Sequence, residues 1–126
     1  MPFSERDWLH LRRVHRVALE RFCARVLDEA AAISHGGRDG HDGGRSAHER
    51  YLALFRLVRE RDAAMEAAFD DLRRSTGLQR LSAMLGLDVL TEQDLAGFQP
   101  EVRDAARALS QVSASRRPAP RRRDRA

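Results

Sequence analysis

Residues 46–72 read SAHERYLALFRLVRERDAAMEAAFDDL and carry the clearest helical pattern in the chain. The stretch opens with Ser46 and Glu49, the residue pair that forms a capping box at a helix N-terminus. After this pair, residues expected to face inward recur at alternating intervals of four and three, which is the spacing of a heptad seam between packed helices. The seam consists of Tyr51, Phe55, Val58, Asp62, Met65, Phe69 and Leu72. The pattern predicts a helix over residues 47–75.

A second long helix is predicted before this stretch, over residues 5–34. It begins at Ser4-Glu5-Arg6-Asp7, a capping-box variant with Asp in place of the usual Glu or Gln. One face is apolar at helical spacing, with Trp8, Leu11, Val14, Ala18, Phe22, Val26 and Ile33. Residues 35–45 hold five glycines in eleven positions, which predicts a flexible connector. A connector of this length favours an antiparallel hairpin.

Shorter helices are predicted after Gly77. One carries Leu78 to Leu85 and stops at Gly86, another starts at the cap residue Thr91, and a third has Pro100 at its first position. No alternating pattern of a strand occurs. The sequence therefore predicts an all-α fold with a long antiparallel helical hairpin, two to three short C-terminal helices and a disordered basic tail. We expect one helical domain over 1–112, with the connector at 35–45, and the tail over 113–126.

Composition narrows the class of protein. No apolar run approaches the roughly 20 residues that span a bilayer, and we find no signal-peptide pattern at the N-terminus. The single cysteine, Cys23, has no partner for an internal disulfide. We therefore expect a cytoplasmic protein with no membrane partner.

The positive charge is concentrated in the tail. Residues 113–126 contain six Arg and one Asp, so a chain of net charge +4 leaves −1 on residues 1–112. The tail arginines are Arg116, Arg117, Arg121, Arg122, Arg123 and Arg125. Such an arm binds polyanions without sequence preference. However, all 23 basic residues are Arg, so compositional bias explains the tail as readily as function does.

One polar pair is predicted inside the hairpin. His15 lies on the apolar face of the first helix, and Asp62 lies in the seam of the second. An antiparallel alignment that sets His15 opposite Met65 brings His15 and Asp62 within about one helical turn. A charge without a partner is costly to bury. We therefore predict a buried His15–Asp62 pair, most simply with a structural role.

Other constellations give weak signals for chemistry. The connector holds His35, Asp39, His41 and Asp42, whose side chains suit a divalent metal, but a plain linker is the simpler interpretation. The paired Glu-x-x-His motifs of a carboxylate-bridged metal bundle do not occur. No nucleophile has a base at a plausible spacing. We expect no metal, no cofactor and no enzymatic activity.

Two functional hypotheses remain. We prefer a small helical scaffold or adaptor that acts by protein–protein contact or self-association, because three short helices can cover only part of two wide apolar faces. The alternative is an accessory nucleic-acid-binding protein that uses the Arg-rich tail. A groove-reading role for Arg103 and Arg107 is disfavoured because the acids Glu101 and Asp104 are interleaved with them.

Overall fold

The computed structural model describes residues 3–35 and 45–116, and within these ranges it is all-α with no strand. The elements are α1 (Glu5–His35), α2 (Ala47–Phe69), the 3₁₀ helix η1 (Arg74–Thr76), α3 (Gly77–Gly86), α4 (Glu92–Ala96) and α5 (Pro100–Arg116). The predicted fold class, with its long first helix and three shorter C-terminal helices, is confirmed.

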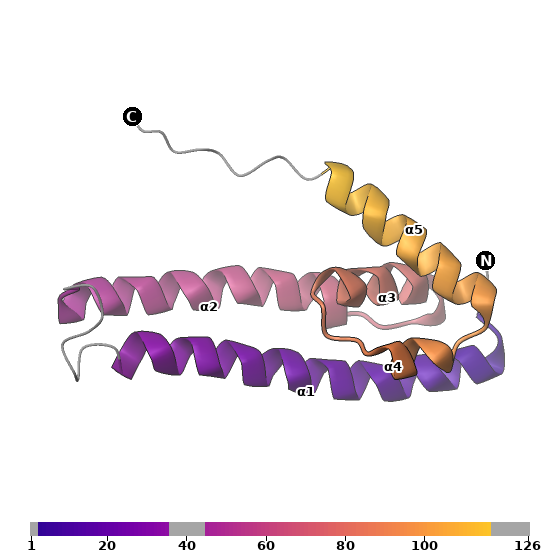
Figure 1. Cartoon of the computed structure of the whole chain (residues 1–126), viewed down its shortest axis with the longest axis horizontal. Coiled ribbons are helices and arrows are strands. Elements are labelled where there is room, and N and C mark those ends of the chain that lie inside the picture. Colours follow the sequence, from indigo (N-terminus) through magenta and orange to yellow (C-terminus); the bar gives the residue numbers. More distant parts are fainter. Residues whose placement is uncertain (1–2, 36–44, 117–126) are drawn as a thin grey trace.

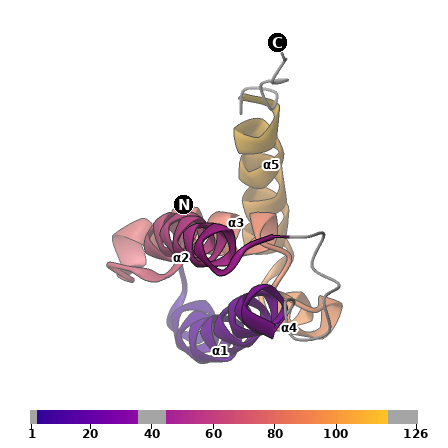
Figure 2. The same ribbon diagram turned by 90° about the vertical axis from the view of Figure 1, so that its left-hand side faces the viewer.

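The two long helices lie side by side and antiparallel (Figure 1). Helices α3, α4 and α5 gather at the end of the hairpin where α1 begins and α2 ends. Figure 2 shows α5 rising away from the hairpin, while α4 lies beside α1. The other end of the hairpin, next to the connector, therefore has no third layer of helices in the described part of the chain.

The predicted helix caps are present. Ser46 Oγ accepts a hydrogen bond from the Glu49 amide at 3.0 Å, and Glu49 Oε1 accepts one from the Ser46 amide at 2.7 Å. At the start of α1, Ser4 Oγ accepts from the Asp7 amide at 3.0 Å. Asp7 is buried, and its carboxylate accepts from the Ser4 hydroxyl and from the Gln99 amide at 3.1 Å. The cap thus also joins the beginnings of α1 and α5.

Helix α2 ends at Phe69, before the predicted boundary at residue 75. The chain turns at Asp71, whose φ of 56° lies in the left-handed region. This turn is held locally, because the Arg73 guanidinium donates two hydrogen bonds to the Asp71 carboxylate at 2.9 and 2.8 Å. The Thr76 hydroxyl also donates to the Asp71 carbonyl at 2.7 Å. Asp and Asn adopt a left-handed backbone conformation more readily than other residues with side chains. The turn therefore forms at an aspartate, at a position where the sequence has no glycine to predict it.

Two other predicted boundaries lie at the edges of the described ranges. Helix α5 continues to Arg116, so the first residues of the tail predicted over 113–126 belong to this helix. The rest of the tail, 117–126, lies outside the described residues. The predicted connector likewise falls mostly outside them, over 36–44, while His35 is the last residue of α1.

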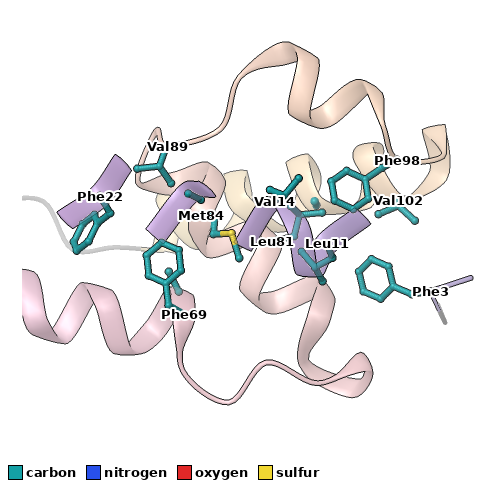
Figure 3. Packing of buried hydrophobic residues seen from close by; sticks show 13 residues of the cluster. Phe3, Leu11, Val14, Phe22, Phe69, Leu81, Met84, Val89, Phe98 and Val102 are labelled. Atoms are coloured by element: carbon teal, nitrogen blue, oxygen red, sulfur yellow. The ribbon is translucent and has the colours of Figure 1, made fainter. Parts of the chain in front are cut away.

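The hydrophobic core lies at the end of the hairpin where the short helices gather (Figure 3). Helix α1 contributes the predicted inward residues Leu11, Val14, Ala18 and Phe22, and all four are buried. Side chains from α3, α5 and the segment between them complete the core, including Leu81, Met84, Val89, Phe98, Val102 and Ala106. The apolar face of α1 is therefore predicted correctly from its spacing.

The predicted seam of α2 is wrong over the half of the helix that precedes the core. Tyr51, Phe55 and Val58 are 64, 52 and 50% exposed, whereas Leu57 is buried. Phe69 alone among the large seam residues is fully buried, at the C-terminal end of the helix. The helix is thus turned by about one residue, or about 100°, from the predicted orientation.

Small residues explain this orientation. Ala64 and Ala68 pack in the core, where α2 meets α1 and α3, and Ala68 is completely buried. Arg80 of α3 donates to the Ala67 carbonyl at 2.9 Å, which fixes α3 against the end of α2. Alanines allow close helix packing, and a larger side chain in their place would separate the helices. Packing at this junction therefore sets which face of α2 turns inward.

Candidate functional site

The rotation of α2 leaves large apolar side chains exposed on the hairpin. Tyr51, Phe55 and Val58 form a row with exposed fractions of 64, 52 and 50%. Leu27 on α1 is 68% exposed. Single exposed apolar residues are common on proteins, but a contiguous group of them is typical of an interaction site.

Leu27 and Val58 line a groove of about 310 Å³ between α1 and α2, which we call the hairpin groove. Its walls are mainly apolar, and the lining residues are Phe22, Cys23, Val26, Leu27, Val58, Arg61, Asp62 and Met65. Phe55 and Tyr51 continue the Val58 row along α2, one turn and two turns before Val58 respectively. The groove and the row together form one apolar face of the hairpin.

A charged pair crosses the two helices beside the groove. The Arg61 guanidinium donates two hydrogen bonds of 3.2 Å to the two carboxylate oxygens of Glu29. The hydrogen bond from Arg61 lowers the pKa of Glu29, against a smaller opposing effect of desolvation. The bidentate contact orients the planar guanidinium. Arg61 of α2 is thereby directed across the hairpin to α1.

The predicted pair of His15 and Asp62 does not form. His15 Nε2 donates to the backbone carbonyl of Phe69 at 2.9 Å, and its ring packs edge-on against the Phe69 ring with 5.4 Å between centroids. Asp62 is exposed, on the rim of the hairpin groove, and makes no ion pair within the described ranges. His15 therefore lies opposite Phe69 rather than Met65, which shifts the register by about one helical turn.

The choice of partner for His15 has a physical reason. Phe69 is the last residue of α2, and the final carbonyl groups of a helix have no amide partner within that helix. A buried carbonyl without a partner is costly, and the imidazole of His15 satisfies this one. The contact stabilises the end of α2.

Other polar side chains of α1 fasten the segment that leads into α4. Arg21 donates to the Val89 carbonyl at 2.9 Å and to the Asp94 carboxylate at 2.7 Å. His10 Nε2 donates to the Asp94 carbonyl at 2.8 Å. Burial raises the pKa of Asp94, but hydrogen bonds from Arg21 and Thr91 outweigh it and lower the pKa overall. These contacts fasten α1 to α4 and to the segment that precedes it.

The remaining sequence candidates are not assembled into a site. Residues 3–35 and 45–116 contain no group of three or more His, Cys, Asp or Glu that could hold a metal ion. Asp39, His41 and Asp42 of the connector lie outside those ranges, as do all tail arginines except Arg116. None of the described helices is long and apolar enough to cross a membrane.

Comparison with known proteins adds no assignment. No family model matches the chain, and neither a curated protein nor a solved structure matches it. The hairpin groove is the most distinctive surface of the described residues, and sequence reasoning missed it. The heptad spacing of α2 did identify this row of residues. The prediction placed the row inside the protein, whereas the structure places Tyr51, Phe55 and Val58 on the surface.

Proposed function

We propose that this protein is a non-enzymatic helical scaffold or adaptor that acts by protein–protein contact, and that the hairpin groove is its contact surface. One observation carries the proposal. The seam residues Tyr51, Phe55 and Val58 are exposed on α2 in a continuous row. Burying a side chain of this size yields about 1.5–3 kcal/mol, so a partner that covers the row gains several such contributions.

The composition of the surface supports this function. Aromatic residues and arginine are enriched at the energetic centres of protein interfaces. Phe55 has the Arg59 guanidinium over its ring at 5.7 Å from the centroid. Arg61 and Asp62 give the groove a charged rim around apolar walls. Such a rim restricts the partners that fit, because an unmatched charge at a desolvated contact weakens binding.

The alternative function, nucleic-acid binding through the Arg-rich tail, rests on the sequence alone. Five of the six tail arginines lie in residues 117–126, while residues 1–112 carry a net charge of −1. Binding through this arm would be insensitive to changes in the hairpin and would weaken steeply with salt. These two properties separate it from binding through the groove.

The test is a quantitative co-purification with the tagged full chain, expressed with an untagged copy, from nuclease-treated lysate. Val58→Asp places a charge in the groove, and Val17→Asp is the matched control. Val17 is also a valine on a long helix, is 41% exposed and does not line the groove. We expect a protein bound in stoichiometric amount, lost with Val58→Asp and kept with Val17→Asp and with deletion of 117–126. Equal capture by both valine variants, or capture lost only with the tail, would contradict the proposal.

A further inference from the structure

We propose that the occupant of the hairpin groove is a second copy of this chain, packed face to face as an antiparallel four-helix bundle across a two-fold axis. The inference rests on the proposed function and names its partner. The exposed row on α2 has the spacing and charge order that complement a second copy of itself.

The exposed row on α2 has the spacing of a seam between packed helices. Tyr51, Phe55, Val58, Asp62 and Met65 follow one another at intervals of four, three, four and three. Side chains at this spacing form a straight seam when two helices pack against each other. Within one chain, Leu57 and Ala64 belong to a neighbouring row that faces the rest of the protein. Helix α2 thus has a second heptad row, and no helix within residues 3–35 and 45–116 covers Tyr51, Phe55 and Val58.

The charge order fixes the direction of packing. Consider an antiparallel pair in which the two copies of α2 cross midway between Val58 and Asp62. Phe55 then contacts Met65 of the second copy, and Val58 contacts Asp62 of the second copy. Arg59 then lies beside Asp62 of the second copy, and the symmetry forms this contact twice. A parallel pair would instead set Asp62 against Asp62, with repulsion between two carboxylates. The row is therefore complementary to itself only in the antiparallel direction.

The available area is sufficient for a specific, modest interface. The 23 residues of α2 span about 35 Å, and two adjacent helices are about 20 Å wide, so each copy offers about 700 Å². Two copies together bury about 1,400 Å², in the lower half of the range for specific interfaces. Helices α3, α4 and α5 gather at the end of the hairpin where α2 ends (Figure 1), and none of their residues lines the hairpin groove. We expect a dimer with a dissociation constant on the order of micromolar.

Analytical ultracentrifugation of the purified full chain from about 1 to 200 μM measures this association. Val58→Asp should weaken the dimer by at least about 100-fold because it buries two unpaired charges. Val17→Asp should leave the dimer unchanged, and circular dichroism should show that both variants are folded. Arg59→Asp and Asp62→Arg should each weaken self-association by at least about 10-fold through like-charge contacts.

Mixing the last two variants is the decisive step. In a heterodimer of Arg59→Asp with Asp62→Arg, both contacts between copies join opposite charges, so the dimer should re-form at nearly the wild-type concentration. A contact within one chain could not produce this rescue, because each chain still carries its own like charges. Failure of the mixture to associate would overturn the antiparallel register.

Three further outcomes show whether this inference, the proposed function or both are wrong. If the wild-type chain is monomeric at 200 μM but captures a different protein that Val58→Asp loses, the second copy is excluded and the adaptor function stands. If the chain is monomeric and captures nothing through the groove, both proposals fail. A dimer that survives Val58→Asp would place self-association on another surface.

Discussion

Gly97 lies where the end of α4 approaches α1, and replacing it by Ala tests how closely the two helices pack. A Cβ atom added at Gly97 would lie 2.5 Å from Cε1 and 2.7 Å from Cδ2 of His10, with Nε2 closer still. These distances are far below the 3.5–4.0 Å of ordinary contact. The imidazole cannot stay in place, and it is held there by the Asp94 carbonyl and by edge-on packing against Phe98, with 4.6 Å between centroids.

The expected cost follows from these contacts. Forcing extra volume into a packed site costs about 1–3 kcal/mol, and loss of the hydrogen bond from His10 contributes about 0.5–1.5 kcal/mol. The backbone at Gly97 has φ −77° and ψ −8°, which alanine adopts without strain. Alanine has less conformational freedom than glycine in the unfolded chain, so the substitution also stabilises the folded protein by about 0.4–1 kcal/mol. We expect Gly97→Ala to lower the free energy of unfolding by about 1–3 kcal/mol.

Urea denaturation followed by circular dichroism measures the effect, with Gly86→Ala as the matched control. A Cβ at Gly86 meets only Ser110 Oγ, at 3.9 Å, so this variant should be stabilised by up to about 1 kcal/mol. In a His10→Ala background the cost of Gly97→Ala should nearly vanish. Wild-type stability for Gly97→Ala, or an equal cost with and without the imidazole, would show that His10 does not limit the space at Gly97.

Three other changes have defined outcomes. Phe69→Ala should cost about 3–5 kcal/mol in urea denaturation because the ring is buried, whereas Phe55→Ala should cost less than about 1 kcal/mol because its ring is half exposed; similar costs would contradict the orientation of α2. The lowered pKa of Asp94 means that its contribution to stability is present above about pH 4 and is lost as pH falls through the folded-state pKa. Asp94→Asn should therefore flatten the loss of stability below about pH 4, and an unchanged pH profile would exclude this origin. Deleting 117–126 should abolish salt-sensitive binding to a generic DNA duplex, and a shortened chain that still binds would locate the site elsewhere.

The fold was predictable because local signals set its boundaries. Ser46, Thr91 and Pro100 each begin a helix by satisfying or removing unpaired amide groups, and such effects need only the neighbouring residues. The apolar face of α1 was also predictable, because its large residues fall in one stripe. The end of α2 could not be predicted, because the turn uses Asp71 in a left-handed conformation and not a glycine.

The orientation of α2 could not be obtained from its hydrophobic pattern. Two adjacent rows of this helix have heptad spacing, and the row with Phe55 and Val58 is the more apolar of the two. The outcome depended on Ala64 and Ala68, whose small size matters only once α3 is known to pack there. His15 was also assigned the wrong partner, because a side-chain pattern cannot show a backbone carbonyl at the end of another helix.

The position of the core at one end of the hairpin has a consequence for local unfolding. The connector end is held by Leu57, by the Glu29–Arg61 pair and by the hydrogen bond from Arg50 to the Ser34 carbonyl at 3.0 Å. Few buried contacts mean a small free energy of opening, so amide hydrogens near this end should exchange well before those of α3. A ligand that bound across α1 and α2 at the connector end would raise the free energy of this opening. Slower amide hydrogen exchange at that end would then report the affinity of the ligand, while exchange in the core stayed unchanged.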